Sequence, residues 1–77
     1  MKTPSIGTLE RLRNNYAPGT RVCLDWMDDT QAPPTGTLGT VVGVDDLGSI
    51  MVQWDNGSML SVVYGEDRCH IVEEEEP

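Results

Sequence analysis

The sequence predicts a mainly β fold, a small five-stranded SH3-like barrel with a short N-terminal helix. Five short strand-like runs, a central meander joined by tight turns and a long first loop support this prediction. Closing or nearly closing such a sheet removes edges that would otherwise pair between molecules. A five-stranded oligonucleotide-binding barrel is the structural alternative, but it normally has longer strands and a helix between strands three and four.

The 77 residues are enough for one domain and leave no room for a second core. We expect an N-terminal helical segment over residues 1–15, the barrel over residues 16–72 and an acidic tail over residues 73–77. A chain this short buries only about 60 % of its unfolded surface, so a modest stability is expected.

A helix is predicted over residues 3–15, because apolar residues recur there at steps of three and four. Thr3 can cap this helix with Pro4 at its first position, or Thr8 can cap a shorter helix. The helix is expected to pack with its apolar stripe across an open end of the sheet. The stripe consists of Ile6, Leu9, Leu12 and Tyr16.

The first strand is predicted at residues 20–26, where Val22, Leu24 and Trp26 alternate with polar residues and face the core. An eleven-residue loop, residues 27–37, contains adjacent prolines that forbid regular pairing. The second strand, residues 38–44, contains Gly39 and Gly43, which indicate bending or a close backbone approach.

A third strand at residues 49–54 and a fourth at 58–63 flank an Asp-Asn-Gly-Ser turn. Asn56-Gly57 predicts a type I′ hairpin, which needs positive φ at both central residues. Ile50, Val52 and Trp54 share the inner face of the third strand. A brief fifth strand is predicted at residues 69–72.

The formal charge is −8, from 13 acidic and 5 basic residues. This charge disfavours direct binding to nucleic acid or to an anionic membrane, and it favours a partner protein with a basic surface. The sequence has no apolar run long enough to cross a bilayer and no secretory signal, so we expect a cytoplasmic protein.

Nothing in the sequence predicts a metal site, a cofactor or an enzyme. Cys69 and His70 are strand neighbours that face opposite sides, and no CxxC or HxxxH spacing occurs. A disulfide between Cys23 and Cys69 is geometrically open if their strands are adjacent, whereas a cytosol favours two reduced thiols. Catalysis by Cys23 with His70 would need an orienting third group and a pocket.

The acidic residues are the candidate partner contacts, if they gather at one end of the barrel. Turn chemistry alone explains Asp45 and Asp46, but less of Asp28, Asp29, Glu66 and Asp67. Calcium-loop spacing is missing around Asp45-Asp46. The acidic candidates are Asp28, Asp29, Asp45, Asp46, Glu66, Asp67, Glu73 and Glu74.

Trp26, Trp54 and Tyr64 are the aromatic candidates for binding a peptide or a cationic side chain. The inward phase predicted for both tryptophans favours core packing. An aromatic cage requires one of the rings to lie at the mouth of the barrel.

Four segments carry a resemblance to a family: APGTRVCLDWMDD (17–29), QAPPTGTLGTVVGVDDLGSI (31–50), VQWDNGS (52–58) and DRCHIV (67–72). Residues 16–72 resemble a small bacterial domain of unknown function that occurs in proteins of phages and mobile elements. The resemblance implies an SH3-like barrel and no established catalytic residues. Gly36, Gly39 and Val41 are also similar to SH3-like modules of the KOW and Tudor sort, which often bind nucleic acid or modified peptides.

These observations favour a non-enzymatic, acidic module that binds protein. The more specific hypothesis is an inhibitor from a mobile element that occupies the basic nucleic-acid channel of a host CRISPR nuclease of the Cas9 type. It rests on an analogy of size and charge with anti-CRISPR proteins. The alternative is an accessory domain that binds a peptide or cationic side chain through its aromatic residues.

Overall fold

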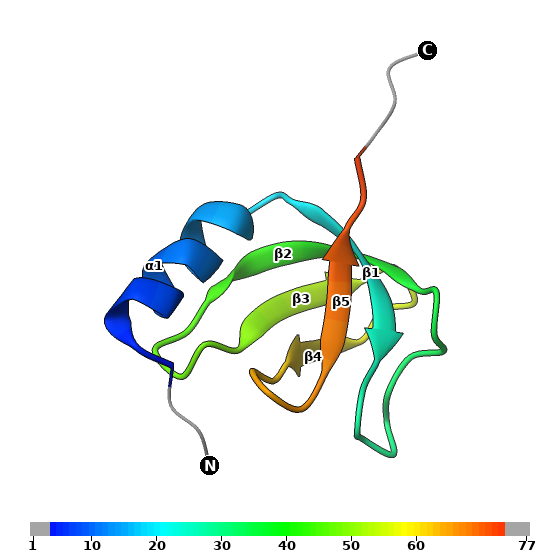
Figure 1. The fold of residues 1–77 in the computed structure, drawn as a ribbon. Helices are drawn as coiled ribbons and strands as arrows, with labels where there is room; N and C mark the ends of the chain where they lie inside the picture. The colour runs from blue at the N-terminus through cyan, green and yellow to red at the C-terminus, as the bar shows by residue number, and fades with distance from the viewer. Residues whose placement is uncertain (1–3, 74–77) are drawn as a thin grey trace.

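The computed structural model describes residues 4–73, which form one helix and five strands (Figure 1). The helix α1 spans Ile6–Asn15 and precedes all the strands. The strands are β1 (Arg21–Trp26), β2 (Leu38–Val44), β3 (Ile50–Trp54), β4 (Met59–Val62) and β5 (Arg68–Ile71). Each predicted strand is present with bounds within one residue of the prediction.

All five strands belong to one antiparallel sheet with the order β4-β3-β2-β1-β5. The mainly β prediction is therefore confirmed, together with the short N-terminal helix. β4 and β5 are the two edges, and no ladder joins them within residues 4–73. Closure into a barrel is not shown by this pairing.

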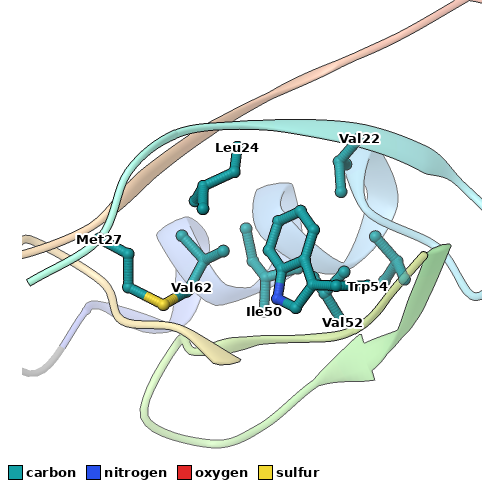
Figure 2. Packing of buried hydrophobic residues seen from close by; sticks show 8 residues of the cluster. Val22, Leu24, Met27, Ile50, Val52, Trp54 and Val62 are labelled. Carbon is teal, nitrogen blue, oxygen red and sulfur yellow. The ribbon is translucent and has the colours of Figure 1, made fainter. Parts of the chain in front are cut away.

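The core lies on one face of the sheet, where side chains of β1 meet those of β3 (Figure 2). Trp54 is 1 % exposed, and its indole Nε1 donates a hydrogen bond to the Leu60 carbonyl at 3.0 Å. The inward face predicted for β3 is confirmed. The buried set is Val22, Leu24, Met27, Val41, Ile50, Val52, Trp54 and Val62.

Trp26 does not belong to this core, so the inward position predicted for it is wrong. β1 pairs Leu24 with Cys69 and then Trp26 with Arg68, which leaves Asp25 as an extra residue in a bulge. The bulge reverses the alternation of β1. Trp26 is therefore 53 % exposed, and Met27 occupies the core position instead.

The helix is shorter than predicted and has a different cap. Ser5 is the N-cap, and its Oγ accepts a hydrogen bond from the Thr8 backbone N–H at 3.2 Å. The caps predicted at Thr3 and Thr8 are wrong: Thr3 lies outside the described residues, and Thr8 lies inside the helix. Ile6 is 77 % exposed, so the apolar stripe begins one turn later, at Leu9.

The Asn56-Gly57 hairpin is not of type I′, because no non-glycine residue among residues 4–73 has positive φ. The Gly57 N–H donates to the Trp54 carbonyl and the Trp54 N–H donates to Ser58. Within this loop only Gly57 has positive φ, at 96°. This is a three-residue loop, a type I turn followed by a glycine bulge.

The β2–β3 hairpin uses the same device, with Gly48 at φ 84°. Arg13 in α1 forms an ion pair with Asp46 in this turn, with 2.7 Å between Nη2 and Oδ1. The helix therefore lies against the β2–β3 end of the sheet, as Figure 1 shows. The β1–β2 loop extends from a different part of the fold.

Candidate functional site

Three of the acidic candidates use their carboxylates to support the backbone. Asp45 Oδ1 accepts from the N–H groups of Leu47 and Ser49, both at 2.9 Å. Asp29 Oδ1 accepts from the Gln31 N–H at 2.7 Å. The local turn explanation is therefore confirmed for Asp45, and the same explanation extends to Asp29.

Asp67 accepts a backbone hydrogen bond on each of its two carboxylate oxygens. Its Oδ1 accepts from the Asp28 N–H at 2.8 Å, and its Oδ2 accepts from the Val63 N–H at 2.9 Å. One carboxylate thus joins the β1–β2 loop to the turn between β4 and β5. This role could not be predicted from local sequence patterns, because Asp28 and Asp67 lie 39 positions apart.

The acidic candidates lie in different connections between the strands. Asp45 and Asp46 lie in the β2–β3 turn beside α1, and Asp67 accepts a hydrogen bond from the backbone of Asp28 in the β1–β2 loop. Glu66 and Glu73 are exposed, and Glu74 lies outside the described residues. A single acidic end of the fold stays a prediction.

Arg21 and Asp55 form an ion pair that the sequence did not indicate. The Arg21 guanidinium reaches both carboxylate oxygens of Asp55, at 2.9 and 2.6 Å. The hydrogen bonds from Arg21 lower the pKa of the Asp55 carboxyl below its usual value. This pair fixes the end of the β3–β4 hairpin against β1.

One hollow, here called the tyrosine hollow, has a volume of about 270 Å³ and opens between α1, β5 and the β4–β5 connection. Its lining includes Tyr16 and Tyr64. The remaining lining residues are Leu12, Asp25, Gly48, Ile50, Val62, Val63, Gly65, Asp67, Arg68 and Cys69.

A second hollow, with a volume of about 470 Å³, adjoins the first and is lined by Asp25, Trp26, Glu66 and Arg68. Asp25 and Arg68 line both hollows. The exposed Trp26 therefore lies next to the tyrosine hollow. Together the two hollows form the candidate site.

Asp25 lines both hollows of this site, although it was not a candidate in the sequence analysis. It forms a 2.8 Å contact from Oδ1 to His70 Nδ1 on the neighbouring strand. The bulge in β1 and the β1–β5 register create this contact. Predicting this contact from the sequence would require knowing which strand pairs with β1.

The aromatic candidates separate into three cases. Trp54 is buried and its N–H is bonded within the core, so a binding role for it is wrong. Tyr64 is half-buried and lines the tyrosine hollow. Trp26 is exposed beside this hollow. Tyr16 also lines the hollow, although the sequence analysis placed it only in the apolar stripe of the helix.

Desolvation affects two ionisable groups in the tyrosine hollow. Burial, and less strongly the charges of Cys69 and Asp25, raises the pKa of the Tyr16 hydroxyl. Burial, together with the charges of Asp25 and Cys23, raises the pKa of the Cys69 thiol to about 11. Both groups are therefore neutral near pH 7.

The two cysteines are free and lie on opposite faces of the sheet. Cys69 is paired with the buried Leu24, whereas Cys23 is paired with His70 on the outer face. The disulfide that the sequence leaves open is incompatible with this register. Within residues 4–73, no group of three His, Cys, Asp or Glu residues is placed to hold a metal ion.

Alkylation should distinguish the Cys69 thiol in the folded protein from the same thiol in the unfolded chain. Since its pKa is raised from 9.0 to about 11, the thiolate fraction at pH 8 falls about 100-fold on folding. In a Cys23→Ser variant, iodoacetamide should therefore react about 100-fold more slowly without urea than in concentrated urea. Equal rates in the two conditions would show that the thiol is not desolvated.

Comparison with protein families gives one match, to a domain of unknown function, DUF4314, over residues 5–72. The chain belongs to this family. The match covers the helix and all five strands of the DUF4314 domain, and therefore every residue that lines the two hollows. The comparison with curated proteins gave no match. In the described part of this DUF4314 domain, the helix is too short and too polar to span a bilayer.

Proposed function

We propose that this DUF4314 domain is a non-enzymatic, acidic protein-binding module that contacts a basic surface of its partner through Trp26 and the carboxylates beside it. The observation that carries the proposal is the 53 % exposure of Trp26 next to Asp25 and Glu66. Exposed tryptophans are costly in water and are concentrated in the energetic centres of protein interfaces. The net charge of −8 supports a basic partner.

Binding to a fluorescent peptide rich in lysine and arginine tests this proposal. Affinity should fall about tenfold or more between 0.1 M and 1 M salt, where the Debye length shrinks from about 10 Å to about 3 Å. A Trp26→Ala variant should weaken binding about tenfold at 0.1 M salt.

The matched control is Leu47→Ala, because Leu47 is also 53 % exposed but lies in the β2–β3 turn. This variant should bind the peptide as the wild type does. Equal effects of the two substitutions would contradict a role for Trp26. A gel shift of DNA or RNA at low salt would contradict the choice of a protein partner.

A narrower form of the proposal retains the CRISPR nuclease as the partner and a phage or mobile element as the source. Its support is the small size and the charge of −8, which match the needs of a competitor for a basic nucleic-acid channel. Excess protein should then slow DNA cleavage by a Cas9-type nuclease. Undiminished cleavage would contradict the nuclease-inhibitor form of the proposal but not the broader proposal of a protein-binding module.

We also propose that the sheet belongs to the SH3-like class. Five short strands, a long first loop and a short segment between β4 and β5 support this assignment. NMR contacts between the two edge strands, β4 and β5, would test this assignment.

A further inference from the structure

The tyrosine hollow has the dimensions of a site for one side chain. Its volume of about 270 Å³ lies just below the range of about 300–1,000 Å³ that is usual for small-molecule sites. Leu12, Ile50 and Val62 supply apolar lining, and Tyr16 and Tyr64 supply two aromatic rings. An apolar chain of a few carbons is therefore complementary to the lining of the hollow.

The charges around the hollow favour a cation at the end of that chain. Asp25 and Asp67 both line it, and neither carboxylate has an ion pair with Lys or Arg within residues 4–73. The charge of Asp25 also contributes to the raised pKa values of Tyr16 and Cys69, which indicates a negative potential inside the hollow. Aromatic rings add attraction for a cation through their faces.

The hydrogen bonds of the two carboxylates distinguish between ammonium and guanidinium groups. A guanidinium binds best when both oxygens of one carboxylate are available. Asp67 already accepts a backbone N–H on each oxygen, and Asp25 Oδ1 contacts His70. A single ammonium group that reaches Asp25 Oδ2 matches this arrangement better.

We infer that this hollow binds a lysine side chain of the partner protein, with its ammonium group near Asp25 and its carbon chain between Tyr16 and Tyr64. The inference rests on the proposed function, since the lysine belongs to the basic surface that Trp26 contacts. It adds the identity of the side chain and the place where it binds. Arg68, which lines both hollows, competes with this lysine for the same negative potential.

A titration with n-butylammonium, followed by the backbone amide NMR signals, tests the hollow without the rest of the partner. We expect saturable shifts at Tyr16, Tyr64 and Cys69 with a dissociation constant on the order of millimolar. The neutral 1-butanol should bind at least about fivefold more weakly, because it lacks the charge. Butylguanidinium should bind more weakly than butylammonium.

Two substitutions of equal charge provide the control. Asp25→Asn keeps an oxygen that can contact His70 but should weaken butylammonium binding about fivefold or more. Asp46→Asn, at the turn beside α1, changes the net charge by the same amount and should leave binding unchanged. Arg68→Ala should strengthen binding, since it removes the competing cation.

The outcomes separate this inference from the proposed function. Absence of saturable shifts, equal binding of 1-butanol, or equal effects of Asp25→Asn and Asp46→Asn would overturn the lysine site. Tighter binding of butylguanidinium would overturn the choice of lysine. If butylammonium binds as expected but the basic peptide does not bind, the lysine site is supported and the proposed function is contradicted. If the basic peptide binds but butylammonium does not, the proposed function is supported and the lysine site is contradicted.

Discussion

A Gly39→Ala variant should lose about 3 kcal/mol of folding free energy, and the reason is purely steric. A Cβ at this position would lie 2.6 Å from Val52 Cγ1 and 2.7 Å from Trp54 Cε3. Both neighbours are about 1 % exposed, and neither is the free end of a flexible chain. Overpacking of this kind costs about 1–3 kcal/mol, and two rigid contacts place the variant at the upper end.

Urea unfolding measures this loss as a fall in the urea concentration at which half of the protein is unfolded. A domain of 77 residues has about 4–12 kcal/mol of stability in total, so the variant could lose most of its folded population. Gly7→Ala is the matched control, because a Cβ there meets nothing within 4 Å and lies in α1. It should stabilise the domain by about 0.5–1 kcal/mol. An unchanged midpoint for Gly39→Ala would contradict the close approach of β2 and β3.

An Asp67→Ala variant should cost about 2–4 kcal/mol, although the residue is on the surface side of a turn. Substitution removes two charge-assisted hydrogen bonds from the backbone N–H groups of Asp28 and Val63. The Val63 N–H is part-buried, so water replaces its partner poorly. The stability of an Asp67→Asn variant, which keeps only one acceptor oxygen, should lie between those of Asp67→Ala and the wild type.

Glu66→Ala controls for the loss of a negative charge at the neighbouring position. Glu66 is exposed and has no hydrogen bond from a side chain within residues 4–73, so its removal should change stability by no more than about 0.5 kcal/mol. Equal midpoints for the two alanine variants would show that Asp67 does not hold the loop. The pair also separates folding from binding, since only Glu66→Ala leaves the fold intact for a partner assay.

The strands could be predicted because each depends on a local pattern of alternation and on glycine-rich or proline-rich turns. Trp26 could not be placed, because the bulge at Asp25 depends on how β5 pairs with β1. The hairpin type was also missed: Asn-Gly suits more than one turn, and the flanking backbone hydrogen bonds select among them.

The candidate site was predictable only in part, because its residues come from distant positions. Trp26, Tyr64 and Glu66 were identified from the sequence, and the structure places all three in the lining of the two hollows. Asp25, Tyr16 and Arg68 were not, since each has an ordinary local explanation. Local reasoning also assigned Asp67 to a partner, whereas its oxygens bind the backbone.

The pairing of β5 with β1 makes the site depend on an edge strand of the sheet. Asp25 and His70 meet across 45 positions of sequence, and both hollows contain residues of β5 or its preceding turn. If this edge strand detaches while the other four strands persist, both hollows disappear. Binding of a ligand there is therefore linked to the pairing of β5 with β1. A domain in which β5 detaches often would bind the ligand weakly, even if every residue that contacts the ligand were unchanged.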